Sequence, residues 1–485
     1  MRPLAVGVAV VLTAGTAHAQ QLQQRIGDPL PGLTAAERVL FDSGKTEFTR
    51  ILSAADGLGP IFNDNSCSTC HSNPRAGGSG SKRVTRFGRA ASGPNPFDPL
   101  ANLGGSLLQI SAIAPECLET VPPQADVEIF RVTPSTAGIG LIEAIRGGDI
   151  RAREFAPPPG VSGRAHMVRS FEKRPAAKLD VGRFGWKAQL ASVLSFSADA
   201  SQNELGISNR FIPTDNAPNG NTVLLAQCDT HPDPEDHADG QGFHAIDRQT
   251  HFQRFLAAPP QTPRSGMAGA PIFETIGCSS CHVSSTYVTG PSPTGVAALA
   301  GQTIRPYSDF LLHDMGSLGD GIVQGMATEN EFRTTPLWGL RPRAEIGLLH
   351  DSRAAGGTPV QNVRDAITAH AGEAQASRDA YVALAPAQQD QLVAFLMSLG
   401  RVEFDREGDH DVDEFDWFFL EDADEFTGPG VSFNAESTAA VADFDQDGDF
   451  DLVDFAGFQR SMTGDQATLD ALEALNAASE AGSDR

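Results

Sequence analysis

The sequence predicts a mainly α-helical protein with two similar helical domains, a partly β insertion in the first domain and a small helical module at the C-terminus. Three observations predict this organisation. The segment PIFNDNSCSTCH, which begins at Pro60, returns as PIFETIGCSSCH at Pro271. Residues 379–400 carry apolar side chains at helical spacing before a terminal glycine. Residues 401–485 are strongly acidic and contain two loops of similar sequence.

The N-terminus is typical of an export signal. Arg2 precedes an apolar stretch from Leu4 to Leu12, and Ala17-His18-Ala19 forms a small-residue cleavage site. We therefore assign residues 1–19 to a signal peptide and expect the mature protein in the periplasm or outside the cell. A short membrane anchor is the alternative, although the apolar run is shorter than a membrane span.

The negative charge is concentrated at the C-terminus. Residues 401–485 contain four Arg, no Lys and 24 acidic residues, a net charge of −20, so residues 1–400 contribute only −5 of the total of −25. A nucleic-acid partner is therefore not expected.

Composition also suggests the domain boundaries. The Pro/Gly-rich stretch LAAPPQTPRSGMAGAP separates an N-terminal domain, residues 20–255, from a second domain, residues 256–400. An acidic module, 401–464, and a tail, 465–485, follow. Between residues 72 and 185, short β-like runs such as VEIFRVT predict an insertion with some strands.

The two C-x-x-C-H motifs carry the chemistry. In an exported protein, neighbouring cysteines can form a disulfide, a metal site or a cofactor attachment. A zinc site would need a fourth ligand, and a redox pair would not need the histidine twice. Two thiols at this spacing can form thioethers to the vinyl groups of a haem, and the next residue then ligates the iron. The sequence therefore predicts two covalent c-type haems, held by Cys67, Cys70, His71, Cys278, Cys281 and His282.

Two further pairs of residues are informative, one that precedes the motifs and one formed by the remaining cysteines. Phe62 and Phe273 lie five residues before their first cysteine, where a helix would bury them on the core or on a haem. Cys117 and Cys228 are an even pair and predict a disulfide in an oxidising compartment, with two buried free thiols as the alternative.

The acidic module contains two candidate calcium loops that resemble dockerin or EF-hand repeats. Each has oxygen ligands at positions 1, 3, 5, 7, 9 and 12 and a glycine at position 6. An acidic solubilising tail is the alternative, but it does not explain the repeated glycine and the phenylalanines after each loop. The predicted Ca²⁺ ligands are Glu403, Asp405, Glu407, Asp409, Asp411 and Glu414 in the first loop, and Asp443, Asp445, Asp447, Asp449, Asp451 and Asp454 in the second.

Residues 35–400 resemble the di-haem c-type oxidoreductases, which are related to bacterial di-haem cytochrome c peroxidases, the methylamine-dehydrogenase maturation enzyme and latex-cleaving rubber oxygenases. The matching stretches are GLGPIFNDNSCSTCH, GGSLLQ, GIGLIEAI, GRFGWKAQ, NELGIS, YSDFLLHDMG, FRTTPLWGLR, LLHDSRA and AITAHAGEA. The resemblance implies two cytochrome c-like haem domains.

The resemblance also implies roles for three residues. Trp186 corresponds to a tryptophan that relays electrons between the haems, unless it is only a core residue. Glu204 falls where the peroxidases keep a distal carboxylate that moves a proton, unless it is a solvated helix-end residue. His370 falls at the sixth ligand of the C-terminal haem, and His350 and His313 compete for that role.

Two departures from the family pattern bear on the reaction. Phe87 replaces a displaceable histidine after the first motif, so we expect an open N-terminal haem. Phe196 replaces a glutamine near that haem, which suits dioxygen chemistry as well as peroxide chemistry.

We therefore expect an exported, peroxidase-like oxidoreductase. A redox protein or small electron donor would pass electrons through the C-terminal haem to the open N-terminal haem, where peroxide or dioxygen is activated. The alternatives are an oxygenase acting on an apolar substrate and a pure electron-transfer cytochrome. The calcium module is a further candidate for docking to a surface or a protein partner.

Overall fold

The computed structural model describes residues 24–400, apart from 92–95, 174–177, 234, 236, 263–266 and 293. It also describes six residues further along the chain, namely 450–452, 454, 455 and 458. The predicted signal peptide, the first calcium loop, most of the second and the tail 465–485 lie outside this part of the chain. Within it, none of the helices is both long and apolar enough to cross a membrane.

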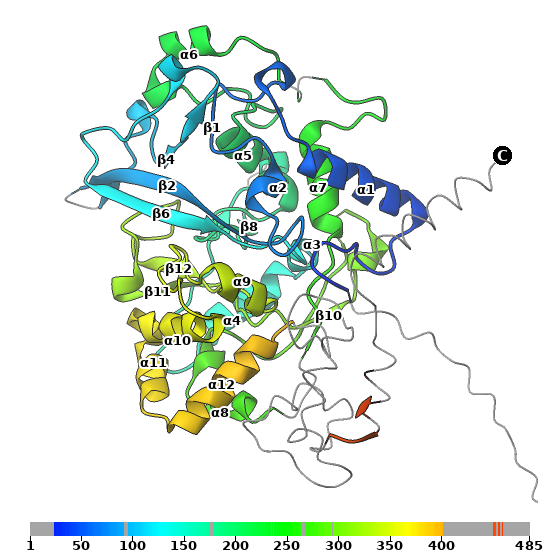
Figure 1. The fold of residues 1–485 in the computed structure, drawn as a ribbon, viewed down its shortest axis with the longest axis vertical. Coiled ribbons are helices and arrows are strands. Elements are labelled where there is room, and N and C mark those ends of the chain that lie inside the picture. Colours follow the sequence, from blue (N-terminus) through cyan, green and yellow to red (C-terminus); the bar gives the residue numbers. More distant parts are fainter. Residues whose placement is uncertain are drawn as a thin grey trace, which may run out of the picture.

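The elements in Figure 1 have the following bounds. The helices are α1 Ala35–Thr49, α2 Cys67–Cys70, α3 Ile139–Glu143, α4 Gly147–Phe155, α5 Val193–Leu205, α6 Thr222–Cys228, α7 Ala245–Phe255, α8 Gly269–Thr275, α9 Leu340–Ile346, α10 Pro359–Ala369, α11 Gln375–Val382 and α12 Pro386–Ser398. The strands are β1 Ile61–Phe62, β2 Gly80–Ala90, β3 Phe97–Asp98, β4 Leu107–Leu108, β5 Ser111–Ala112, β6 Val127–Thr133, β7 Met167–Val168, β8 Asp180–Val181, β9 Tyr287–Val288, β10 Thr303–Ile304, β11 Leu312–Asp314 and β12 Glu331–Arg333.

The prediction of a mainly α-helical fold is wrong. The structure is 38% helix and 14% strand, with several small sheets. Two of these sheets, β9–β10 and β11–β12, lie in residues 256–400, where only helices were expected. Their strands are two or three residues long, which is too short to show a period-2 pattern in the sequence. The expected helical calcium module lies almost wholly outside the described residues.

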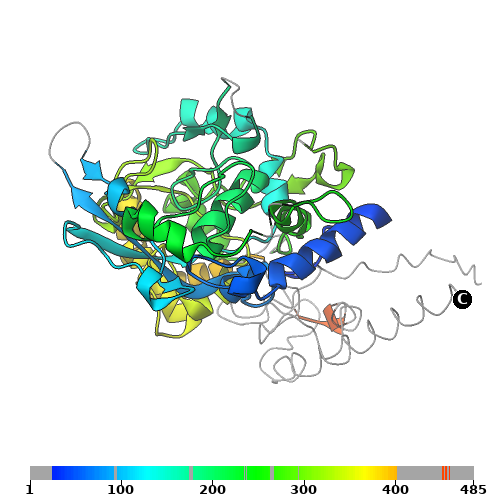
Figure 2. The ribbon, with the colours of Figure 1, turned by 90° about the horizontal axis from the view of Figure 1, so that it is seen from above.

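The N-terminal half is organised around α1 and α7. The capping box of Thr34 and Glu37 starts α1. Phe41 and Phe48 of α1 pack on Phe252 of α7, with ring centroids 5.2 and 4.7 Å apart. Figures 1 and 2 both show α1 (blue) beside α7 (green). On α1, Phe48 also lies beside His71, with ring centroids 6.0 Å apart, so this helix borders the first C-x-x-C-H motif.

The longest strands lie between the two halves of the molecule. β2 pairs antiparallel with β6, the predicted strand VEIFRVT, and also with β3 and β4. β2 contacts α2 on one side and α9 on the other, as Figure 1 shows. The side-chain amide of Asn73 donates to the carbonyl of Pro342 (2.7 Å), so the loop after the first motif contacts the C-terminal half directly.

The C-terminal half packs α8 against α12. The helix predicted over residues 379–400 is confirmed only for α12, because α11 ends at Val382 and a new helix begins at Pro386. Leu392, Val393, Phe395 and Leu396 of α12 are buried, and the helix stops just before the glycine of residue 400. A Cβ atom on Gly269 would lie 2.1 Å from the carbonyl oxygen of Gln391, so only glycine allows this close helix contact.

The two repeated lead-ins fold differently. Phe273 lies on α8 and is buried, as predicted. Phe62 instead lies in β1, opposite Ser111 of β5, so the expected helix before the first motif is wrong. The predicted disulfide is present between Cys117 and Cys228, whose Cα atoms are 6.1 Å apart.

Candidate functional site

The first C-x-x-C-H motif forms the short helix α2, and His71 follows directly as its C-cap. Nδ1 of His71 donates to the carbonyl of Gly78 (3.3 Å). Burial lowers the pKa of His71 to about 4, although the carbonyls of Gly78 and Pro134 act in the opposite direction. A neutral imidazole whose Nδ1 carries the proton has its Nε2 lone pair available for a metal.

The second motif repeats this arrangement on a different local backbone. Cys278–Ser280 is a single 3₁₀ turn, and Nδ1 of His282 donates to the carbonyl of Tyr307 (3.1 Å). Burial and then the neighbouring His370 lower the pKa of His282 to about 4. Both motif histidines are therefore neutral and held in the tautomer that suits an iron ligand.

The four motif thiols are unpaired and partly buried. Burial raises the pKa of Cys67, Cys70 and Cys278 to about 12 and also raises the pKa of Cys281. The sulfur of a thioether carries no charge, so these buried, uncharged thiols are compatible with haem attachment.

A cavity of about 520 Å³ adjoins the second motif. This volume is in the usual range for a cofactor site. Cys278, Cys281 and His282 lie on one part of its wall, and His370 and Trp186 lie on others. The combination of two thiols, two histidines and mostly apolar walls fits a haem attached through Cys278 and Cys281.

Among the three candidate sixth ligands, the geometry favours His370. It caps the end of α10, and its Nδ1 donates to the carbonyl of Ala366 (2.7 Å), which leaves Nε2 free. His370 also lies close enough to His282 to lower its pKa.

The other two candidates are engaged elsewhere. Both ring nitrogens of His313 are bonded to carboxylates. The ring of His350 stacks on Phe332, with centroids 4.2 Å apart, and meets Trp186 edge-on at 6.2 Å.

Trp186 lies along the cavity wall and is linked towards the first motif through the backbone. Its Nε1 donates to the carbonyl of Val132 (2.9 Å) in β6. Pro134, two residues further on, is the residue whose carbonyl acts on His71. A short covalent and hydrogen-bonded path therefore connects the surroundings of His71 with the cavity beside His282.

Glu204 lies near the first motif at the end of α5. The side-chain amide of Asn63 donates to its Oε2 (2.8 Å). Burial raises the pKa of Glu204, Asp199 raises it further, and Arg86 opposes the rise. The charge of Glu204 in turn raises the pKa of Cys67 and Cys70. Glu204 is half-buried at the helix end and hydrogen-bonded, and its role in proton transfer stays a prediction.

Phe87 and Phe196, the two departures from the family pattern, both contribute apolar surface. Phe87 lies in β2 and is fully buried. Phe196 lies on α5, stacks on Phe184 with centroids 6.1 Å apart, and lines the cavity with it.

Sequence reasoning missed a buried ion network beside Trp186. Asp320 Oδ2 accepts from Arg131 (2.6 Å), and its Oδ1 lies 3.3 Å from the ammonium of Lys187, with all three side chains nearly inaccessible. Lys187 also donates to the carbonyls of residues 328, 329 and 331. A lysine directly after the predicted relay tryptophan was the available signal, but its partners lie far away in the sequence.

Only Asp451 and Asp454 of the predicted calcium ligands lie among the described residues. Asp454 is buried, and its Oδ2 accepts the backbone N–H of Asp451 (2.8 Å). The other predicted ligands lie outside the described residues, so the calcium loops stay a prediction.

Comparison with known proteins gives one match. A family model described as "Di-haem oxidoreductase, putative peroxidase" matches residues 118–399. This range contains the second motif, Trp186, Glu204 and His370, whereas the first motif lies outside it. Searches of curated proteins and of solved structures found no match.

Proposed function

The chain belongs to the di-haem oxidoreductase family, and from this premise we propose that it is an exported, peroxidase-like enzyme with two covalently attached c-type haems. Cys67 and Cys70 would hold one haem, with His71 as its ligand. Cys278 and Cys281 would hold the other. The Cys117–Cys228 disulfide supports export, because such bonds persist in oxidising compartments.

The observation that carries this proposal is the unequal surroundings of the two motif histidines. His282 has His370 beside it, with a free Nε2 on each ring. Among the described residues, the ring of His71 contacts the carbonyl of Gly78 and the ring of Phe48, and the sequence contains no histidine between His71 and His166. The C-terminal site therefore suits two histidine ligands and electron transfer, whereas the N-terminal site keeps one position for a substrate.

When bound, haem supplies one-electron redox chemistry and an iron that can bind a small oxidant. The protein would contribute proton transfer and insulation. Glu204 would take a proton from the incoming peroxide and return it to the leaving oxygen. Trp186 would link the surroundings of the two sites. A redox protein or small donor would deliver electrons on the His282 side.

Electron paramagnetic resonance of the oxidised holoprotein tests the proposal. One high-spin signal that cyanide abolishes and one low-spin signal that ignores cyanide are expected. His370→Ala should convert the low-spin signal to high-spin without loss of haem. Two low-spin signals that both ignore cyanide would instead identify an electron-transfer cytochrome. Release of haem from the denatured protein into acidified organic solvent would contradict covalent attachment.

A second candidate is an oxygenase that cleaves an apolar substrate. Phe196 favours it, because an apolar side chain that stacks on Phe184 stands where the peroxidases have a glutamine. Reaction of the reduced protein with dioxygen, and not of the resting protein with peroxide, would select this function.

We also propose that the acidic module binds Ca²⁺ through the loops at 403–414 and 443–454, and that it docks the enzyme to a surface or partner. The ligand spacing supports binding. Truncation after Gly400 should abolish calcium binding in titration calorimetry and leave both haems attached. Unchanged calcium stoichiometry would place the sites elsewhere.

A further inference from the structure

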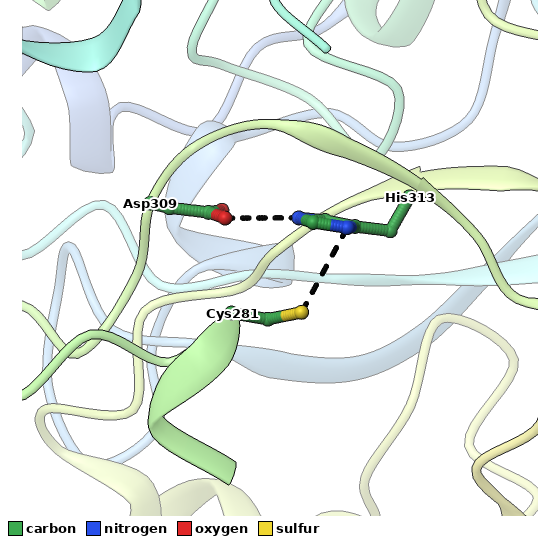
Figure 3. A group of neighbouring side chains, drawn as sticks. All are labelled: Cys281, Asp309 and His313. Carbon is green, nitrogen blue, oxygen red and sulfur yellow. Dashed lines mark hydrogen bonds and ion pairs between the residues drawn. The ribbon is translucent and has the colours of Figure 1, made fainter. Parts of the chain in front are cut away.

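A buried cluster of charged side chains lies against the second motif (Figure 3). His313, 2% exposed, is bonded at both ring nitrogens: Nε2 to Asp309 Oδ2 (2.9 Å) and Nδ1 to Glu373 Oε2 (2.8 Å). The Sγ atom of Cys281 lies 3.7 Å from the same Nδ1. Because both ring nitrogens bond carboxylate oxygens, both must donate, so the ring is an imidazolium. Burial alone would lower the pKa of His313, but the bonds to Asp309, Cys281 and Glu373 raise it to about 12.

This cluster does not suit a metal ion, although it contains cysteine, aspartate and histidine. Figure 3 shows the carboxylate of Asp309 at one ring nitrogen of His313 and the Sγ atom of Cys281 at the other. Both ring nitrogens of His313 therefore already have hydrogen-bond partners. An imidazolium has no lone pair to offer, so the cluster is a set of hydrogen bonds.

On one side, the cluster is hydrogen-bonded to the segment that carries His282, the proposed iron ligand of the second motif. The backbone N–H of Asp309 donates to the carbonyl of Cys281 (3.0 Å), the residue before His282. The carboxylate of Asp309 meanwhile bonds the ring of His313. His313 is therefore connected to the second motif through a single residue.

On the other side, the cluster holds the segment that carries His370. Glu373 follows His370 by three residues and forms a direct ion pair with His313. The Oε1 atom of Glu373 accepts from the hydroxyl of Ser162 (2.7 Å), and Oε2 accepts from the backbone N–H of the same serine (2.9 Å). Glu373 is thus fixed from two directions.

The ring of His313 has little room to move. A Cβ atom on Gly163 would lie 2.4 Å from its Cε1 atom, so the neighbouring backbone packs directly against the imidazole. Asp309 is also held, because its Oδ1 accepts the backbone N–H of Leu311 (3.0 Å). Because the ring of His313 and both carboxylates are held in place, the separation between Asp309 and Glu373 is fixed.

We propose that His313 is a positioning residue that sets the separation between His282 and His370, and so keeps the second haem closed to added ligands. The inference rests on the proposed ligation of that haem by both histidines. Alteration of the groups that orient metal ligands commonly changes metal affinity or activity by about 10- to 100-fold.

The test compares His313→Gln with His166→Gln in the holoprotein. His166 is a matched control: it is 2% exposed, its Nδ1 bonds the carbonyl of Lys187 (2.7 Å), and its Nε2 accepts from the backbone of Met326 (3.1 Å). It does not line the cavity. The readouts are the low-spin signal and the rate of cyanide binding at the second haem. His313→Gln should raise that rate by about 10- to 100-fold over the control.

A second variant covers the case in which His313→Gln does not load haem. Glu373→Gln removes one charge from the cluster but keeps its shape and should give a smaller shift in the same direction. If both variants match His166→Gln in spin state and cyanide binding, the positioning role is refuted while the ligation stands. A second haem that is already high-spin in the wild type would instead refute the proposed ligation, and with it the inference.

Discussion

Glu204→Gln gives the sharpest test of the reaction. The substitution keeps the size of the side chain and a partner for the amide of Asn63, but it removes the group that accepts a proton. A positioned acid/base contributes about 10²–10⁴-fold to a rate, which corresponds to about 3–5 kcal/mol of barrier. We expect the absorbance change on mixing with hydrogen peroxide to slow by that factor in stopped-flow measurements, with both resting spectra unchanged.

The pH dependence of this rate tests the same carboxylate through its neighbours. Only the deprotonated form accepts a proton, so the rate falls as the pH drops below the pKa of Glu204. Burial and Asp199 raise this pKa above its ordinary value of 4.5, and Arg86 lowers it. Asp199→Asn should therefore move this fall in rate at low pH, the acid limb of the pH profile, to lower pH, and Arg86→Gln should move it to higher pH.

These opposite shifts make the reasoning refutable. An unchanged rate in Glu204→Gln would remove this residue from the mechanism and favour the oxygenase alternative. If the rate falls but both neighbour variants shift the acid limb in the same direction, the limb belongs to another group.

Two further predictions concern stability, measured by denaturant unfolding. Asp320→Asn leaves two buried cations without their carboxylate and should lower the free energy of unfolding by about 3–5 kcal/mol, and adding Lys187→Met should recover part of the loss. A loss below about 1 kcal/mol would mean that water reaches the network. Replacing Cys117 and Cys228 by serine should cost about 4–5 kcal/mol on the chain-entropy model for a loop of this length, and equal stability with and without reductant in the wild type would contradict this.

The sequence alone was most informative where the signal is local. The C-x-x-C-H spacing predicts haem attachment because thiols and imidazole must lie within one turn of each other, and this attachment stays a prediction. VEIFRVT was recognised as a strand, and the helix predicted over residues 379–400 contains α12, since each is long enough to show its own periodicity. The two cysteines left over outside the motifs, together with the predicted export signal, predicted the Cys117–Cys228 disulfide.

Local sequence was insufficient where backbone pairing is decided at a distance. The two Ile-Phe lead-ins are identical as dipeptides. Phe62, however, lies in a strand that pairs with β5, whereas Phe273 lies on α8 and packs against α12. The expectation of a mainly helical chain was wrong for the same reason, because pairs of two- or three-residue strands form only when their partners are brought together.

The choice among the three candidate sixth ligands of the second haem also depends on tertiary structure. His313, His350 and His370 offer the same imidazole, and their order along the chain does not rank them. Carboxylates take both nitrogens of the first, aromatic rings enclose the second, and a helix end leaves the Nε2 of the third free beside His282. Chemistry could be predicted from residue type and spacing, whereas the role of each imidazole depends on partners that only the folded chain brings into contact.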